Sequence, residues 1–122
     1  DQSIKVKIKL RRKVKNHLGS MYLGALAVGA DITSGYFALH FSNKNKKKIS
    51  LVFKDFHADF LRRPTGDVVF ECNMGDDIND MIHAAILTKD RQNLPVIVNA
   101  KVPSLSQDVV ASFTLTLSVK VK

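Results

Sequence analysis

The stretch that most constrains the fold is 20–34, where nearly every side chain is apolar or small. Ser20 suits the N-cap of a helix and Gly35 suits the position just after one, so these residues predict where a helix begins and ends. A helix that is apolar all round is buried by the rest of its domain. We therefore expect a buried central helix, roughly 22 Å long. Its small residues would let a sheet or a second helix approach closely: Gly24, Ala25, Ala27, Gly29 and Ala30.

Strand patterns surround this helix. Residues 4–10 alternate strictly between apolar and charged side chains, which predicts a strand with one buried face and with lysines in water. In residues 47–61 the alternation slips by one position between Phe53 and Phe56, and a β-bulge would explain the slip. Four further segments have strand patterns: 36–41, 67–72, 94–102 and 109–121.

A second helix is predicted over residues 76–90. Apolar side chains recur there at the spacing of an amphipathic helix: Ile78, Met81, Ile82, Ala85 and Ile86. The expected order is one strand, the buried helix, three strands, the amphipathic helix and two strands. This order favours an α+β fold in which a long, curved antiparallel sheet wraps around the central helix. At 122 residues the chain has the size of one domain, spanning residues 1–122.

Several kinds of chemistry are disfavoured by the sequence. The single cysteine, Cys72, excludes an internal disulfide and a cysteine-based zinc site, and it suits a small core residue. His57, Asp59 and His83 match no metal-ligand spacing, so neither a metal nor a cofactor is expected. No G-x-S-x-G elbow, P-loop or G-x-G-x-x-G motif occurs. Because there is no run of 18 apolar residues and no signal-peptide block, we expect a cytoplasmic protein without a membrane span.

Three segments carry a resemblance to a known superfamily. They are Asn16-His17-x-Gly19-Ser20-Met21-Tyr22-x-Gly24-Ala25-Leu26-Ala27 with Gly29-Ala30-Asp31, residues 53–62, and Val109-Val110-Ala111. These segments resemble the hot-dog-fold thioesterases, in particular an uncharacterised thioesterase-like branch, over nearly the whole chain. In such proteins a sheet wraps a long central helix, and two subunits pair edge to edge. The resemblance implies a homodimer, or a dimer of dimers, that binds acyl-CoA or acyl-carrier-protein thioesters at the subunit interface.

The resemblance also implies a site. A carboxylate along the helix acts as base or nucleophile, and an amide at the helix start holds the thioester carbonyl. Asp31 is the only acidic residue in 2–54, and it lies near the end of the expected helix. Burial there would make its carboxylate more basic, which suits a general base. The amides of Gly19 and Ser20 would lie at the helix N-terminus, where free N–H groups stabilise a developing oxyanion.

Asn16 and His17 could orient substrate or water beside Asp31. Structural interpretations stay open for all three: a carboxylate satisfied by backbone, water or partner for Asp31, a hydrogen bond at the strand–helix corner for His17, and a turn or cap for Asn16. The Asn16-His17 pair also differs from the Asn-x-x-Gly-x-x-His-Gly-Gly pattern of phenylacetic-acid-pathway thioesterases. We favour an acyl thioester hydrolase. The alternatives are a non-catalytic acyl-ligand binding protein of the same fold and a dehydratase or hydratase acting on acyl thioesters.

The charge of the chain is concentrated in two places. Lysine and arginine number 19 against 11 acidic residues, which gives a net charge of +8. Basic residues gather in residues 1–15, and a second cluster holds Lys44, Lys46, Lys47 and Lys48. We favour a solvated strand face and loop, ahead of attraction of coenzyme A phosphates. Nucleic-acid binding is the least favoured interpretation, because aromatic residues do not alternate with the basic ones.

Overall fold

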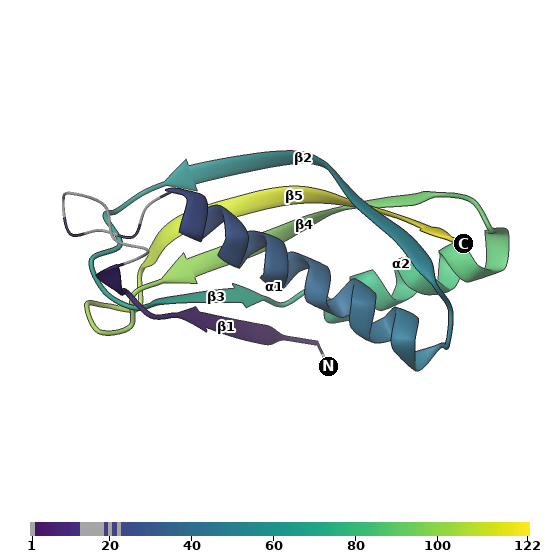
Figure 1. The fold of residues 1–122 in the computed structure, drawn as a ribbon, viewed down its shortest axis with the longest axis horizontal. Helices are drawn as coiled ribbons and strands as arrows, with labels where there is room; N and C mark the ends of the chain where they lie inside the picture. Colours follow the sequence, from purple (N-terminus) through teal and green to yellow (C-terminus); the bar gives the residue numbers. More distant parts are fainter. Residues whose placement is uncertain (1, 13–18, 20, 22) are drawn as a thin grey trace.

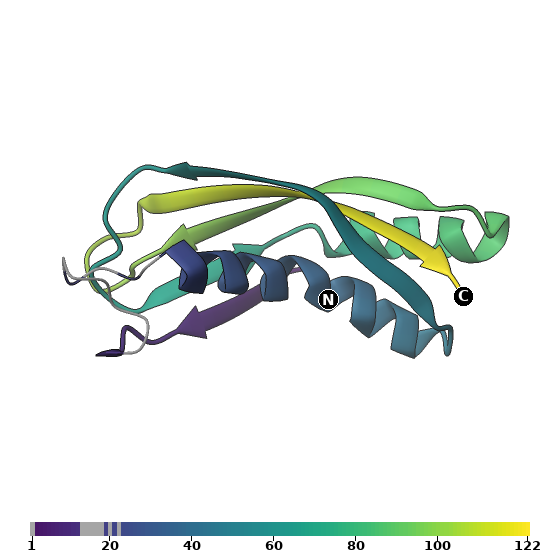
Figure 2. The ribbon, with the colours of Figure 1, turned by 45° about the horizontal axis from the view of Figure 1, so that its top comes forward.

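The computed structural model describes residues 2–12, 19, 21 and 23–122. Within them the chain forms β1 (Ile4–Ile8), α1 (Leu23–Lys44), β2 (Ile49–Phe60), β3 (Val68–Cys72), α2 (Gly75–Thr88), β4 (Gln92–Lys101) and β5 (Val109–Val121). The strands make one antiparallel sheet in the order β1-β3-β4-β5-β2, and α1 crosses its face diagonally (Figure 1). The sheet curves over α1, and α2 lies at the end where α1 finishes (Figure 2). This is the predicted α+β arrangement.

The predicted N-terminal strand is confirmed as β1, which forms one edge of the sheet. Its isoleucine and valine side chains are half-buried, whereas the lysines between them are exposed. Lys5 pairs with Glu71 of β3 at 3.5 Å, and Lys7 pairs with Asp67, just before β3 begins, at 3.6 Å. Because exposed ion pairs contribute little stability, the burial of the apolar face holds β1 in place.

The predicted β-bulge in β2 is also confirmed. The register between β2 and β5 shifts between Phe53 and Phe56. The Asp55 carboxylate accepts hydrogen bonds from the amide and the hydroxyl of Thr116, each at 3.0 Å, and so holds the bulge. Since Phe53 lies opposite Leu117 and Phe56 opposite Leu115, both phenylalanines face the helix side of the sheet.

The predicted end of the central helix at residue 34 is wrong, as is the predicted strand over 36–41. The helix continues to Lys44, so its 22 residues span roughly 33 Å. An apolar run fits a buried strand or a buried helix equally well by periodicity, and here burial at Ala30, Phe37 and Phe41 follows the helical spacing. The turn comes only at Lys46, which adopts a left-handed φ of 56°.

The face of α1 that points away from the core is apolar and exposed. One face is buried against the sheet, but Val28, Ile32, Tyr36 and Leu39 on the opposite face are 45–54% exposed. The prediction of a helix buried on all sides is therefore wrong for the single chain. An apolar helix face left in water is typical of a surface that binds another molecule.

The second predicted helix is confirmed as α2, with Ile78, Met81, Ile82 and Ala85 buried. The N-terminal segment caps it, because Gln2 accepts hydrogen bonds from the amides of Gly75 at 2.9 Å and Asp76 at 2.6 Å. Cys72 is fully buried, as predicted, and burial raises the pKa of its thiol. None of the helices in the described ranges is long and apolar enough to cross a membrane.

Candidate functional site

The candidate site is a groove between α1 and β2, which we call the Asp31 groove. Two hollows meet at Asp31. The first has a volume of about 310 Å³ and is lined by Asp31, Ile32, Gly35, Tyr36, Leu39 and Leu51. The second, of about 270 Å³, is lined by Ala27, Val28, Asp31, Phe53, Phe56 and Leu115. Each volume is close to the lower end of the range for small-molecule sites.

The geometry of the two elements explains why these residues meet. Positions 28, 32, 36 and 39 recur at helical spacing and therefore share the exposed face of α1 with Asp31. The opposite wall comes from β2, where the bulge turns Phe53 and Phe56 to the same side. Because β2 is the last strand in the sheet order, no other described strand shields its outer side, and Phe56 is 44% exposed.

Asp31 is the single charged residue in the lining of the groove. It lies well inside α1, thirteen residues before Lys44, and its side chain is exposed. The predictions of a position near the helix end and of burial within the chain are therefore wrong. Its carboxylate has no hydrogen-bond or ion-pair partner among the residues that the structure describes. An uncommitted carboxylate in an apolar groove is available to a water molecule or a ligand.

The other predicted site residues precede α1. Asn16, His17 and Ser20 lie outside the described residues. Gly19 has a left-handed φ of 77°, which favours glycine, and it lies four residues before α1 begins rather than on its first turn. Met21 fixes the approach to the helix, because it is buried and its amide donates a hydrogen bond to the Pro64 carbonyl at 3.0 Å.

The comparisons with known proteins agree with this architecture. Residues 1–119 match the model of a protein family described as Domain of unknown function (DUF4442). The chain belongs to this family. No curated protein matches the chain significantly in sequence.

Solved structures with the same fold as this DUF4442 chain include proteins described as thioesterases. A Pseudomonas aeruginosa protein of unknown function, described as a probable thioesterase, matches with a TM-score of 0.81 at 20% identity, over 99% of this chain and 78% of that one. A Haemophilus influenzae thioesterase matches with a TM-score of 0.67 at 16% identity, over 98% of this chain and 72% of that one. A variant of a Staphylococcus aureus thioesterase matches with a TM-score of 0.72 at 13% identity, over 98% of this chain and 87% of that one. The DUF4442 chain thus has the hot-dog fold.

Sequence reasoning missed most of the groove in this DUF4442 chain. The apolar pattern over 36–41 predicts a strand that contains Tyr36 and Leu39, although Val28, Ile32 and Tyr36 continue one helical spacing past Gly35. That continuation was the signal available in the sequence. Nothing local predicts that Phe53 would face Asp31, because this proximity depends on how β2 pairs with the rest of the sheet.

A histidine–aspartate pair on β2 lies away from the groove. Nε2 of His57 is 3.3 Å from an Asp59 carboxylate oxygen, and both side chains are exposed. They lie opposite Thr114 and Ser112 of β5, on the sheet face that points away from the helices. Across the described ranges, no group of three histidine, cysteine or acidic side chains is arranged to hold a metal ion.

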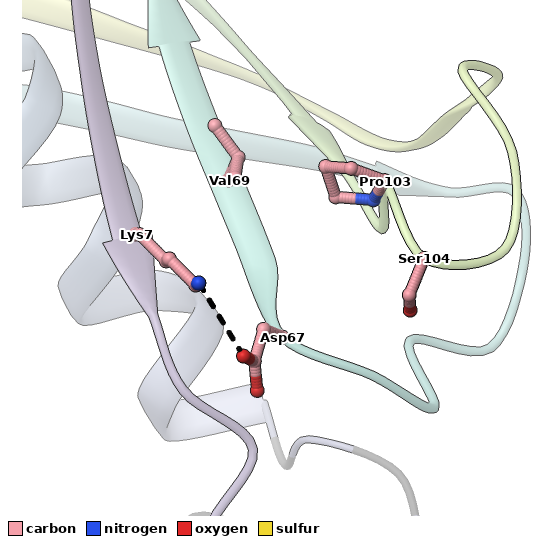
Figure 3. Close-up of a pocket in the computed structure, with 5 residues that line it drawn as sticks. All are labelled: Lys7, Asp67, Val69, Pro103 and Ser104. Carbon is pink, nitrogen blue, oxygen red and sulfur yellow. Dashed lines mark ion pairs between the residues drawn. The ribbon is translucent and has the colours of Figure 1, made fainter.

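A smaller hollow of about 170 Å³ lies beside β1 and β3, and its lining includes Lys7, Asp67 and Ser104 (Figure 3). The carboxylate of Asp67 in this hollow has partners within the chain. Its Oδ1 accepts a hydrogen bond from the Leu10 amide at 2.7 Å, and its Oδ2 pairs with Lys7 at 3.6 Å. Because both oxygens have partners, we interpret Asp67 as a structural anchor for the end of β1.

Asp67 makes the stability of the chain depend on pH. The hydrogen bond from the Leu10 amide and, to a smaller extent, the Lys7 charge hold the pKa of Asp67 below its ordinary value. A carboxyl of this kind stabilises the fold above its ordinary pKa, and the stabilisation is lost as the pH falls through its folded-state pKa. Between about pH 6 and about pH 3, Asp67→Asn should therefore lose less stability than the wild type in urea denaturation. Asp90→Asn, a control elsewhere on the surface, should lose as much stability as the wild type over this pH range. If Asp67→Asn also loses as much stability as the wild type, Asp67 does not anchor β1 in the way we describe.

Proposed function

We propose that this protein hydrolyses acyl thioesters of coenzyme A or acyl carrier protein in the Asp31 groove, at a homodimer interface. The observation that carries the proposal is the uncommitted Asp31 carboxylate in a groove otherwise lined by apolar residues and Gly35. The thioesterases of the same fold, described above, support the reaction class. The apolar hollow lined by Val28, Phe53 and Phe56 suits an acyl chain, since its burial is favoured in proportion to its apolar area.

The chemistry assigned to Asp31 is general-base or nucleophilic catalysis. As a base, its carboxylate takes a proton from water while the water oxygen attacks the thioester carbonyl carbon. The tetrahedral intermediate then collapses, the C–S bond breaks, and the thiolate leaves and gains a proton. As a nucleophile, the carboxylate would itself attack the carbonyl carbon, and an anhydride would form as the C–S bond breaks and the thiolate leaves and gains a proton. Water would then hydrolyse the anhydride, which releases the free acid and regenerates the carboxylate. In either route the amides of Gly19 and Ser20 would stabilise the oxyanion, and Asn16 and His17 would position the substrate.

A second copy of the chain would complete this site. β2 pairs only with β5 among the described elements, so its other edge is open to a second β2. Proteins seldom leave a long edge strand of this kind unprotected. Edge-to-edge pairing would bring the exposed apolar faces of two α1 helices together and would cover the groove. Covering it would exclude bulk water from the groove around Asp31.

Hydrolysis of a panel of acyl-CoA thioesters tests the function. Release of the thiol is followed with a thiol-reactive dye, using straight acyl chains of increasing length. We expect turnover to rise with chain length until the groove is filled. If no thioester is hydrolysed but native mass spectrometry finds a copurified acyl ligand, the protein is a non-catalytic binder and the proposal is wrong.

The dimer is tested by placing a charge on the exposed face of α1. Leu39 is 53% exposed in the single chain, and we expect it to be buried in the dimer. Leu39→Glu would bury an unpaired carboxylate there, and we expect it to raise the dimer Kd by about 100-fold, equal to about 2.7 kcal/mol. Sedimentation velocity measures the shift. Leu87→Glu is the matched control, because Leu87 is 83% exposed on α2; a Leu39→Glu protein that stays as dimeric as this control would contradict the interface.

A further inference from the structure

Basic side chains from three separate parts of the chain meet at one end of the molecule. The turn between α1 and β2, the end of α2 and the end of β5 lie together there (Figure 1). A hollow of about 320 Å³ is lined by Lys47, Ile86, Lys89, Val121 and Lys122. The same three segments carry further basic residues, and together with the three lining lysines we call these residues the basic end: Lys44, Lys46, Lys47, Lys48, Lys89, Arg91, Lys120 and Lys122.

The basic end is exposed and carries little compensating charge. All eight side chains are exposed, and within the described part of the chain none forms an ion pair. Asp90 is the single acidic residue in the segments 43–49, 86–92 and 119–122. Like charges held together repel one another, and an anionic ligand relieves this repulsion. In contrast, Lys5 and Lys7 on β1 already pair with carboxylates.

Backbone hydrogen bonds fix the lining lysines in place. The Lys47 amide donates to the Ser42 carbonyl at 3.0 Å, and the Lys122 amide donates to the Lys48 carbonyl at 2.9 Å. Lys89 adopts a left-handed φ of 61°, and its amide donates to the Ala85 carbonyl at 2.9 Å. The backbone positions of the three lysines around the hollow are therefore fixed by the fold.

The basic end lies within reach of the Asp31 groove. From Asp31 to Lys44 the thirteen residues of α1 span roughly 20 Å, and the groove extends toward that end as far as Leu39. The pantetheine arm of coenzyme A has about thirteen bonds between its sulfur and its nearest phosphorus. This equals just over four peptide units, or roughly 15 Å when extended. A thioester held near Asp31 would thus place its phosphates close to the basic end.

We infer that the basic end binds the phosphates of coenzyme A, with Lys47, Lys89 and Lys122 around them. The inference rests on the proposed function for its substrate, and it selects coenzyme A over acyl carrier protein. Coenzyme A presents several phosphate charges in one compact group, which suits a concave hollow lined by lysines, whereas a carrier protein would need a broad complementary surface. Lysine ammonium groups bind phosphate as point charges.

Titration of free coenzyme A into the full chain tests this inference without requiring hydrolysis. We expect the triple variant Lys47→Gln, Lys89→Gln, Lys122→Gln to bind coenzyme A at least about tenfold more weakly, and its KM for acyl-CoA to rise. Its KM for the matching acyl-pantetheine, which has no phosphates, should stay unchanged. Lys9→Gln, Arg11→Gln, Arg12→Gln is the matched control, since it removes the same charge from the region of β1. Circular dichroism melting curves check that both variants fold.

The outcomes separate this inference from the proposed function. Equal coenzyme A affinity for wild type and the lysine variant, or equal weakening in the control, would overturn the basic end as the phosphate site. Binding of acidic acyl carrier protein, anionic vesicles or an oligonucleotide in place of free coenzyme A would overturn it in favour of that macromolecule. If wild type and control bind coenzyme A more tightly than the lysine variant, but no thioester is hydrolysed, the phosphate site stands and the proposed function fails.

Discussion

Asp31→Asn is expected to lower the rate of thioester hydrolysis by about 10²–10⁴-fold, the range assigned to a lost general base. Asparagine keeps the size of the side chain but cannot accept a proton from water or attack a carbonyl carbon. The effect should fall on kcat, because the apolar walls that bind the acyl chain are untouched. Steady-state kinetics with the best acyl-CoA substrate measure it, and sedimentation velocity should find the oligomeric state of the variant unchanged.

The matched control for this variant is Asp80→Asn. Asp80 is an exposed carboxylate on α2, outside the residues that line the Asp31 groove. Both variants lose one negative charge from a helix surface, so a general effect of charge would lower both rates equally. Full turnover in Asp31→Asn would remove this carboxylate from the mechanism.

Gly29→Ala is expected to destabilise the fold by about 1–3 kcal/mol in urea denaturation. A Cβ atom at this position would overlap ring atoms Cε1 and Cζ of Phe70. Phe70 is fully buried beside Phe113, with ring centroids 6.2 Å apart, so its ring cannot move without disturbing the core. The overlap outweighs the gain of about 1 kcal/mol that alanine has over glycine within a helix.

Gly35→Ala is the control, because we expect it to raise the free energy of unfolding rather than to lower it. It lies on the same helix, but its Cβ would meet the Phe53 ring at 3.7 Å and the Leu51 side chain at 3.9 Å, which are ordinary contacts. We expect a gain of up to about 1 kcal/mol from helix propensity. A Gly29→Ala protein as stable as Gly35→Ala would mean that α1 does not depend on close approach to β3.

Local patterns predicted the parts of the fold that depend on local spacing. Alternation predicted β1, the spacing of Ile78, Met81 and Ile82 predicted α2, and the slip after Phe53 predicted the bulge. The length of α1 could not be read in the same way. Gly35 looks like a helix stop in the sequence, yet it lies within the helix and packs against β2, a contact that exists only in the folded chain.

The charged residue of the candidate site could be predicted from the sequence, but the groove around it could not. Asp31 stands out in the sequence because no other acidic residue occurs nearby. Its environment was predicted wrongly, since burial was inferred from an apolar helix whose outer face is exposed in the single chain. The wall contributed by Phe53 and Phe56 arises from the position of β2 at the sheet edge, which depends on pairing between distant segments.

A crystal structure with a non-hydrolysable acyl-CoA analogue, in which a methylene group replaces the reacting sulfur, tests whether the Asp31 groove is the active site. The Asp31 groove predicts an acyl chain lying between α1 and β2, with the analogue's carbonyl carbon beside the Asp31 carboxylate or its bound water. An analogue bound elsewhere, with the groove filled by side chains of a second copy, would show that the groove is a subunit contact and not the active site.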